Sequence, residues 1–389
     1  MRIVDVCAFY SPQGGGVRTY IEQKLRIGPE LGHEIVILAP GDDHSVIEHG
    51  PMARIITIPS PRLPFDRKYW YFGDEPALHA ALDALDPDFV EVASPWRSPH
   101  YVARWPSSKQ RRAAPRSLVM HHDPFSVYAY RWLEPWLRRE TIDRQVDFFW
   151  QHMRELGQAY DRVVCANREL QGRLARGGVA GTALHPMGVD TALFRPDRRD
   201  PAMRRRLLEI CDLPEDAHLL IGAGRFCAEK RWPVVIDAVM RASLTMPIGL
   251  ALFGEGGAQK RLAKHIAGNP HIQLVSPERD RVKFATILAS ADALVHASTS
   301  ETFGMAPAEA RACGVPVIVP DEGGAADHAR GGAGLTYRAG NALAAAEAIL
   351  ALLSDPSPRP VQPALTMRDH FAALFADYER IVEGERQVA

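Results

Sequence analysis

Short hydrophobic runs recur along the first half of the chain, and each is followed by a polar or glycine-rich turn and then by residues with helical spacing. Runs of this length with few polar residues are typical of parallel strands that are buried on both faces. The pattern predicts parallel strands joined by crossover helices, the first beginning at about Val17. The predicted strands are RIVDVCAFY (2–10), EIVILAP (34–40), FVEVAS (89–94), RSLVMHH (116–122), RVVCAN (162–167) and TALHPMG (182–188).

The same rhythm begins again after Pro196. Its predicted strands are HLLIGAG (218–224), IGLALFG (248–254), IQLVS (272–276), ALVHAS (293–298) and PVIVP (316–320). The sequence therefore predicts two doubly wound α/β domains. Because turn-forming residues and prolines accumulate near 187–201, we expect the first domain to span 1–190 and the second 191–365.

A last helix is expected at 366–389, after the proline-rich stretch SDPSPRPVQPA. Its apolar residues fall on one face, so this helix needs a surface on which to pack, and the first domain is the candidate. These residues are Phe371, Leu374, Phe375, Tyr378 and Ile381.

Composition narrows the class of protein. The 389 residues are 46% hydrophobic and 24% charged with a formal net charge of -1, which is ordinary for a globular protein and gives no sign of nucleic-acid binding. Five dispersed cysteines without metal-ligand spacing favour reduced thiols and a cytoplasmic location. The first residues are too charged for a signal peptide, and no run is long enough to span a membrane, so at most a peripheral association with the inner face of the cell membrane is expected.

Two turns that follow predicted strands could bind an anion. SPQGGGVRTY (11–20) places Gly15 and Gly16 before a helix, where backbone N–H groups are exposed, although it lacks the GxGxxG spacing and could be only a tight turn. GAGRFCAEKRW (222–232) places Arg225 and Lys230 beyond a strand end, where ligands of open α/β sheets bind. These two cations could neutralise a diphosphate without a metal, or could belong to a solvated basic loop.

The stretch SETFGMAPAEARACG (300–314) contains two carboxylates among small and apolar residues. Glu301 is expected in a strand-to-helix loop, Gly304 and Met305 at the start of the helix, and Glu309 inside it. The helix start could receive a phosphate, and each carboxylate could accept hydrogen bonds from sugar hydroxyls. The alternative is a helix-dipole acid and an unrelated surface acid.

Two adjacent histidines, His121 and His122, end the predicted strand at 116–122 and precede Asp123. Since neighbouring strand residues point to opposite faces, only one of the two imidazoles could face a ligand. No convergent partners for a metal can be identified.

Together these residues resemble the family 4 retaining glycosyltransferases of GT-B fold. The resemblance covers nearly the whole chain and is carried by Arg225-x4-Lys230, Glu301-x-Phe303-Gly304-x4-Glu309, Gly14-Gly15-Gly16, Gly188-Val189-Asp190 with Phe194 and Pro196, and Gly323-Gly324. It implies two Rossmann-like domains that face a cleft, a C-terminal helix that returns to the first domain, and a UDP- or GDP-linked sugar held by the second domain.

Matching positions imply roles for individual residues. Arg225 and Lys230 would hold the donor diphosphate, Glu309 the ribose hydroxyls and Glu301 the transferred sugar. The rest of the expected donor site is Gly15, Gly16, Ser276, Phe303, Gly304 and Met305. His121 is the preferred catalytic histidine, with His122 as the neighbouring choice.

The implied reaction is retaining and metal-independent, with the leaving diphosphate taking the proton of the acceptor. The chain departs from the family pattern at three places. His296-Ala297-Ser298 stands where the family often has Pro-Ser. The glutamate that usually follows Gly323-Gly324 is displaced by Asp327. Ser276-Pro277-Glu278-Arg279 replaces a common glycine turn at the expected base-binding edge.

The sequence gives fewer indications of the acceptor than of the donor. Six of seven tryptophans lie in the first domain near the basic stretch RWPSSKQRRAAPR (104–116), which suits a saccharide or an anionic lipid headgroup, although most tryptophans are expected in the core. We expect transfer of a hexose to a membrane lipid or glycan precursor. The alternatives are a sugar-nucleotide epimerase or hydrolase of GT-B fold, a dinucleotide oxidoreductase, and a non-catalytic nucleotide-sugar binding protein.

Overall fold

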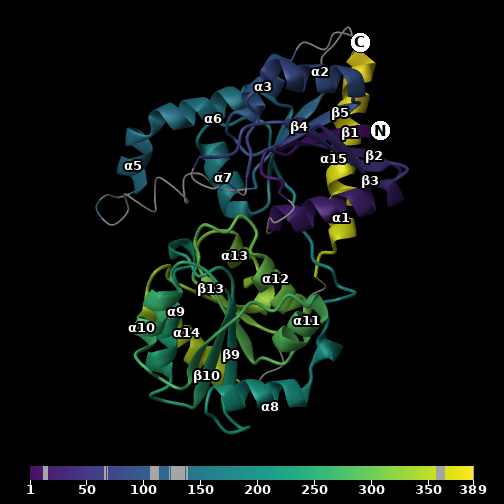
Figure 1. Cartoon of the computed structure of the whole chain (residues 1–389). Helices are drawn as coiled ribbons and strands as arrows, with labels where there is room; N and C mark the ends of the chain where they lie inside the picture. The colour runs from purple at the N-terminus through teal and green to yellow at the C-terminus, as the bar shows by residue number, and fades with distance from the viewer. Residues whose placement is uncertain are drawn as a thin grey trace. The chain divides into compact units, whose positions relative to one another are not determined.

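The computed structural model describes residues 1–11, 16–64, 67, 69–105, 114–121, 123, 136, 139–355 and 364–388. The chain divides into two compact units: unit 1 comprises Met1–Pro186 and Met367–Ala389, and unit 2 comprises Met187–Thr366. The division falls after Pro186 instead of after residue 190. Each unit is built on its own parallel or mainly parallel sheet with helices packed against it (Figure 1), as the α/β prediction requires.

The sheet of unit 1 has the strand order β3-β4-β2-β1-β5-β6-β7-β8. The strands are β1 (Arg2–Val6), β2 (Glu34–Gly41), β3 (Ser45–Gly50), β4 (Ala53–Pro59), β5 (Phe89–Ala93), β6 (Arg116–Val119), β7 (Arg162–Cys165) and β8 (Thr182–Leu184). All neighbouring pairs are parallel except β3 and β4, which form an antiparallel pair at one edge.

Helices of unit 1 begin where the sequence supplies caps. Asp74 accepts a hydrogen bond from the backbone N–H of Ala77 at the start of α2, and Asn167 does the same for Leu170 at the start of α7. The helices of this unit are α1 (Gly16–Glu30), α2 (Glu75–Leu85), α3 (Ser98–Arg104), α5 (Arg139–Gln145), α6 (Asp147–Ala159), α7 (Arg168–Arg176) and α15 (Met367–Val388).

Helix α15 returns to unit 1 and lies beside α1 (Figure 1). Four of the five apolar residues expected on its inner face are buried, and the fifth, Ile381, is half-buried. The helix also buries Met367, His370, Asp377 and Val382. Phe89 of β5 stacks on Tyr378 with ring centroids 4.0 Å apart. Nδ1–H of His370 donates to the carbonyl of Pro186 at 2.8 Å, which leaves Nε2 to accept from the Tyr20 hydroxyl at 3.2 Å.

A fully buried charge cluster lies between α1, the sheet and α15. Lys24 Nζ is 2.8 Å from Asp5 Oδ2 and 2.7 Å from Glu91 Oε1, and all three side chains are inaccessible to solvent. Asp5 and Glu91 are paired residues of neighbouring parallel strands, so their side chains point to the same face. The Tyr378 hydroxyl donates to Glu91 Oε2 at 2.8 Å, which joins α15 to the cluster.

The two carboxyl groups of the cluster differ in ionisation. Burial raises the pKa of Asp5 to about 7, although the nearby ammonium of Lys24 opposes the shift. Burial would also raise the pKa of Glu91, but that pKa lies below its ordinary value because Lys24 and the Tyr378 hydroxyl stabilise the carboxylate. The cluster therefore favours an ionised Glu91, an ionised Lys24 and, at pH values below about 7, a protonated Asp5.

Unit 2 contains a six-stranded parallel sheet with the order β11-β10-β9-β12-β13-β14. Its strands are β9 (His218–Ala223), β10 (Ile248–Phe253), β11 (Ile272–Val275), β12 (Ala293–Val295), β13 (Val317–Pro320) and β14 (Gly334–Tyr337). Its helices are α8 (Pro201–Ile210), α9 (Trp232–Ala242), α10 (Gln259–Ile266), α11 (Arg281–Ala289), α12 (Met305–Ala312), α13 (Gly324–Asp327) and α14 (Ala342–Ser354).

The core of unit 2 consists of two apolar layers. Side chains of α9, α10 and α14 pack with one set of strand residues, while those of α8, α11 and α12 pack with the other. Within the described residues of either unit, no helix is long and apolar enough to cross a membrane.

We expect substitution of Lys24 by methionine to destabilise unit 1 by about 3–5 kcal/mol, because two buried carboxyl groups lose their cation. Arg26→Met on the same helix is the control, since Arg26 is exposed and should change stability by less than about 0.5 kcal/mol. Urea unfolding followed by the fluorescence of tryptophan measures both. Equal stabilities of the two variants would contradict the role of the cluster.

Asp5→Asn tests the proton held by the cluster. Because the pKa of Asp5 in the folded state is raised to about 7, the folded chain binds a proton that the unfolded chain has already lost, so this group lowers stability as the pH rises from about 4 to 7. The free energy of unfolding of the wild type, relative to Asp5→Asn, should fall by up to about 1.4 kcal/mol per pH unit in that window. Parallel pH profiles of the two proteins would show that Asp5 does not bind this proton.

Candidate functional site

Three neighbouring strands of unit 2 end at one edge of the sheet and are followed by the loops that contain most of the predicted donor residues. β9 lies next to β12, and β12 lies next to β13, all in parallel. The loop after β9 contains Arg225 and Lys230, and the loop after β12 contains Glu301. Since parallel strands present their carboxyl ends at the same edge, the topology brings these two loops together.

Glycines allow the loops after β12 and β13 to touch through their backbones. The N–H of Gly324 donates to the carbonyl of Glu301 at 2.7 Å. A Cβ at Gly324 would lie 2.5 Å from the carbonyl oxygen of Thr302, and Gly323 adopts a φ of 75° that also favours glycine. The pair Gly323-Gly324 therefore fixes the backbone on which Glu301 is presented.

Glu301 is the centre of the polar contacts in these loops. Its Oε1 forms an ion pair with Lys230 Nζ and lies 3.2 Å from His296 Nε2. Burial would raise the pKa of Glu301, but the charge of Lys230 and the contact with His296 outweigh it and hold that pKa well below its ordinary value. Glu301 is therefore an ionised carboxylate with a cation beside it.

Arg225 is placed differently from Lys230. Its guanidinium is 76% exposed and its Nη2 is 3.3 Å from Glu229 Oε2. Its backbone is fixed, because Nε1–H of the buried Trp232 donates to the carbonyl of Arg225 at 2.9 Å. Only Lys230 of the two predicted cations contacts Glu301, while Arg225 extends from the same loop into solvent.

The predicted start of the helix is confirmed at Met305, the first residue of α12, with Gly304 at the preceding position in a left-handed conformation (φ 88°). Phe303 is buried, with its ring centroid 4.7 Å from that of His328. Nε2–H of His328 donates to the carbonyl of Phe303 at 2.7 Å, and burial lowers the pKa of His328 to about 4, so this imidazole is neutral. His328 thus fixes the backbone of the turn that leads into α12.

Glu309 is buried in α12, with 4% of its surface exposed, and forms an ion pair with Arg281 of α11. Burial raises its pKa, although Arg281 opposes the shift. The guanidinium of Arg281 also lies over the rings of Phe194 and Phe284, at 4.9 Å and 5.6 Å from their centroids. Nothing in the sequence pattern distinguished Arg281 from other helix-start arginines, so its pairing with Glu309 was not predicted.

The remaining predicted residues are spread over both units. Ser276 directly follows β11 and is exposed. In unit 1, Gly16 is the first residue of α1, whereas Gly15 and His122 lie outside the described residues.

His121 does not lie on a strand as expected, because β6 ends at Val119. Alternation of strand faces therefore does not determine the direction of the His121 side chain. The ring of His121 packs edge-on against Tyr20 at 5.0 Å, and Asp123 forms an ion pair with Arg173 of α7.

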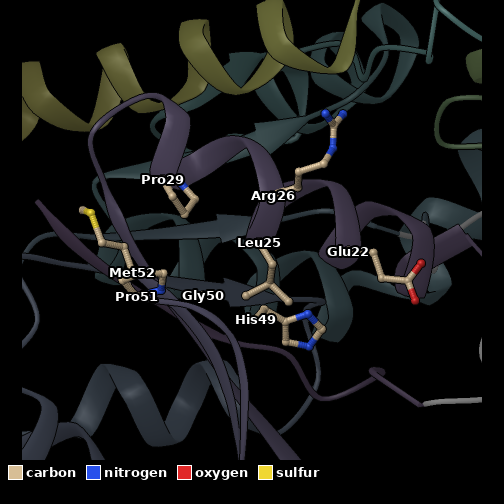
Figure 2. A pocket seen from close by; sticks show the side chains of 8 residues that line it. All are labelled: Glu22, Leu25, Arg26, Pro29, His49, Gly50, Pro51 and Met52. Atoms are coloured by element: carbon tan, nitrogen blue, oxygen red, sulfur yellow. The ribbon is translucent and has the colours of Figure 1, made fainter.

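Unit 1 also has a hollow of about 420 Å³ between α1 and the turn that joins β3 to β4. Figure 2 shows Leu25, Pro29 and Met52 around it, with Glu22 and Arg26 along the same helix. None of the predicted site residues lines this hollow.

The loops of unit 2 can bind an anion and a hydroxyl-rich group side by side. Lys230 and Arg225 offer positive charge, while Glu301 offers a carboxylate that accepts hydrogen bonds. Across the residues that the structure describes, no group of three or more histidine, cysteine, aspartate or glutamate side chains could hold a metal ion.

Comparisons with known proteins match both halves of the chain. Residues 14–193 match the model Glycosyltransferase Family 4, and residues 204–365 match Glycosyl transferases group 1. A GDP-mannose-dependent alpha-(1-6)-phosphatidylinositol dimannoside mannosyltransferase of Mycobacterium tuberculosis is 30% identical over 325 residues, which cover 82% of this chain and 79% of that protein.

Another relative from M. tuberculosis, a GDP-mannose-dependent alpha-mannosyltransferase, is 25% identical over 331 residues, covering 84% of this chain and 81% of that protein. Among solved structures, sucrose-phosphate synthase from Thermosynechococcus elongatus superposes with a TM-score of 0.72 at 21% identity and covers 100% of this chain and 99% of its own. With the fold, both family models and the mannosyltransferase in agreement, the chain belongs to the group 1 (family 4) glycosyltransferases of GT-B fold, enzymes that transfer a sugar from a nucleotide sugar.

Proposed function

We propose that this protein is a retaining hexosyltransferase that transfers mannose from GDP-mannose to a hydroxyl of a membrane lipid or glycan precursor. The observation that carries the proposal is the ionised Glu301 beside Lys230, at the strand ends where this fold binds its ligands. The donor is inferred from the relatives whose names specify GDP-mannose.

In this proposal the two cations of the loop after β9 bind the donor diphosphate. Lys230 is partly buried and forms an ion pair with Glu301, so its ammonium is oriented before the donor binds. The side chain of Arg225 is exposed and moves toward the diphosphate when the donor binds. The first N–H groups of α12 add hydrogen bonds to the phosphate end. Charge on the leaving group is thus neutralised by side chains and backbone, without a divalent metal.

The sugar and the ribose are assigned to the two carboxylates. Glu301 accepts hydrogen bonds from the hydroxyls of the transferred mannose, and Glu309 accepts those of the ribose when it is released from Arg281. As the bond between C1 of the mannose and the diphosphate oxygen breaks, the acceptor oxygen forms a bond to C1 on the same face and gives its proton to the leaving diphosphate, so the anomeric configuration is retained. His121 and His122 remain candidates for a role in the same transfer.

The membrane association is proposed for unit 1. Lys109, Arg111 and Arg112 of the expected basic stretch lie outside the described residues. Arg104 forms an ion pair with Glu75, and Arg116 donates to the carbonyl of Val102, so both side chains have partners within unit 1. Large aromatic side chains are instead exposed near α5 and α6, where Trp136 is 84% and Phe148 74% accessible. Aromatic side chains of this kind favour the interface between lipid and water.

The donor assignment predicts different defects for the two glutamates. We expect Glu301→Gln to reduce kcat by about 100-fold with little change in the affinity for GDP, because it acts on the sugar. Glu309→Gln should weaken GDP binding about 10-fold, the loss of one hydrogen bond to a charged group. Calorimetry and a radiolabelled mannose-transfer assay measure these effects, with Glu215→Gln, an exposed carboxylate of unit 2, as control. The reverse pattern would refute the two assignments.

The proposed reaction is tested directly by nuclear magnetic resonance of the product. GDP-α-mannose should give an α-mannoside, activity should persist in a metal chelator, and donor alone should remain intact. A β-linked product refutes retention, and loss of activity in the chelator refutes metal independence. Conversion of donor without acceptor would instead favour an epimerase or hydrolase, and binding without turnover a nucleotide-sugar binding protein.

Liposome flotation tests the membrane surface. The double substitution Trp136→Ala and Phe148→Ala should reduce the fraction bound to anionic vesicles about 10-fold or more, since each buried aromatic contributes roughly 2 kcal/mol. Leu244→Ala, which removes an exposed apolar side chain from unit 2, is the matched control and should leave binding unchanged. Equal flotation of all three proteins would place the membrane contact elsewhere.

A further inference from the structure

His296 is a buried imidazole with an unusual set of contacts. It directly follows β12, only 2% of it is exposed, and neither ring nitrogen makes a hydrogen bond of good geometry within the described residues. Its Nε2 lies 3.2 Å from Oε1 of Glu301. Burying a polar ring without hydrogen bonds costs free energy, and the electrostatic contact of Nε2 with the Glu301 carboxylate offsets part of that cost.

The ring of His296 has little freedom to move. Its backbone N–H donates to the carbonyl of Ile318 at 2.9 Å, and its own carbonyl accepts from the hydroxyl of Tyr337 at 2.7 Å. The imidazole meets the face of Trp232 edge-on, with ring centroids 6.4 Å apart. Nε1–H of Trp232 in turn donates to the carbonyl of Arg225, so His296 packs against a residue that fixes the loop after β9, and it also contacts Glu301 in the loop after β12.

The contacts of Glu301 with Lys230 and His296 fall on the same oxygen. Lys230 and His296 each approach Oε1, which leaves Oε2 for a hydroxyl of the sugar. Lys230 is also proposed to bind the donor diphosphate, and a dianionic ligand competes with a single carboxylate for its ammonium. When Lys230 turns to the diphosphate, a second fixed partner is needed to prevent the carboxylate from rotating away from the sugar.

We propose that His296 is a positioning residue that holds Oε1 of Glu301 while Lys230 binds the donor diphosphate, so that Oε2 stays directed at the transferred sugar. This inference rests on the proposed function, since it assigns Glu301 to the sugar and Lys230 to the diphosphate. It also explains why a polar ring occupies the interior directly after β12.

A packing role and a positioning role of His296 predict different effects of an apolar substitution on the rate of transfer. If His296 only fills space, an apolar residue of similar size should serve equally in catalysis. If it positions Glu301, His296→Leu removes a buried unsatisfied ring, so the melting temperature should be maintained or rise while transfer slows. His296→Asn keeps a side-chain N–H that can reach the carboxylate and should recover part of the rate.

The experiment compares wild type, His296→Leu, His296→Asn and His265→Leu in the full chain with GDP and GDP-mannose. His265 is an exposed histidine of α10 that pairs with Asp237, so its substitution should leave activity unchanged. For His296→Leu we expect a 10- to 100-fold lower kcat, the range found for residues that orient a functional ligand, with an affinity for GDP within about twofold of wild type and an unchanged melting temperature.

Two results overturn the inference while the proposed function stands. One is a His296→Leu enzyme that transfers mannose at the wild-type rate. The other is a parallel loss of GDP affinity and melting temperature, which shows a structural role alone. A wild-type chain that neither binds GDP nor transfers mannose would overturn the proposed function itself, and this inference with it.

Discussion

The parallel pairing of β9, β12 and β13 is the constraint on which the candidate site depends. Lys230 and Glu301 are 71 positions apart in the sequence, and they meet because adjacent parallel strands end at one edge of the sheet. The loops are then fixed locally, by glycine contacts between backbones and by the buried rings of Trp232 and His328. Chemistry on these loops is therefore supported by a rigid sheet.

Both units place a lysine against buried or nearly buried carboxyl groups, with different consequences. In unit 1, Lys24 is sealed from solvent with Asp5 and Glu91, and the arrangement joins the sheet to α1 and α15. In unit 2, Lys230 and Glu301 retain some access to solvent, so a ligand can enter and exchange partners with them. The two arrangements thus differ in solvent access: the first is closed within a core, and the second is open enough for the ligand exchange that the proposed donor site requires.

Much of the fold could be predicted because buried parallel strands leave nearly continuous apolar runs. The strands missed were β3, β4 and β14. β3 is exposed at the edge and carries polar residues, and β14 is a short segment without a strong apolar pattern. β4 has the apolar run ARIITIP, which was present in the sequence and was overlooked. In the site, the loops of Lys230 and Glu301 follow from strand ends and glycines. The partners Arg281 and His296 could not be predicted, since their roles depend on which helices and strands pack side by side.

The position of α15 bears on how the chain folds during its synthesis. This helix packs on unit 1 but is encoded after the whole of unit 2, and its Tyr378 supplies a hydrogen bond that buried Glu91 needs. Domains usually fold in the order in which the ribosome delivers them. Here unit 2 has all its residues before unit 1 does, so the surface of the first sheet that receives α15 stays uncovered until that helix has been synthesised.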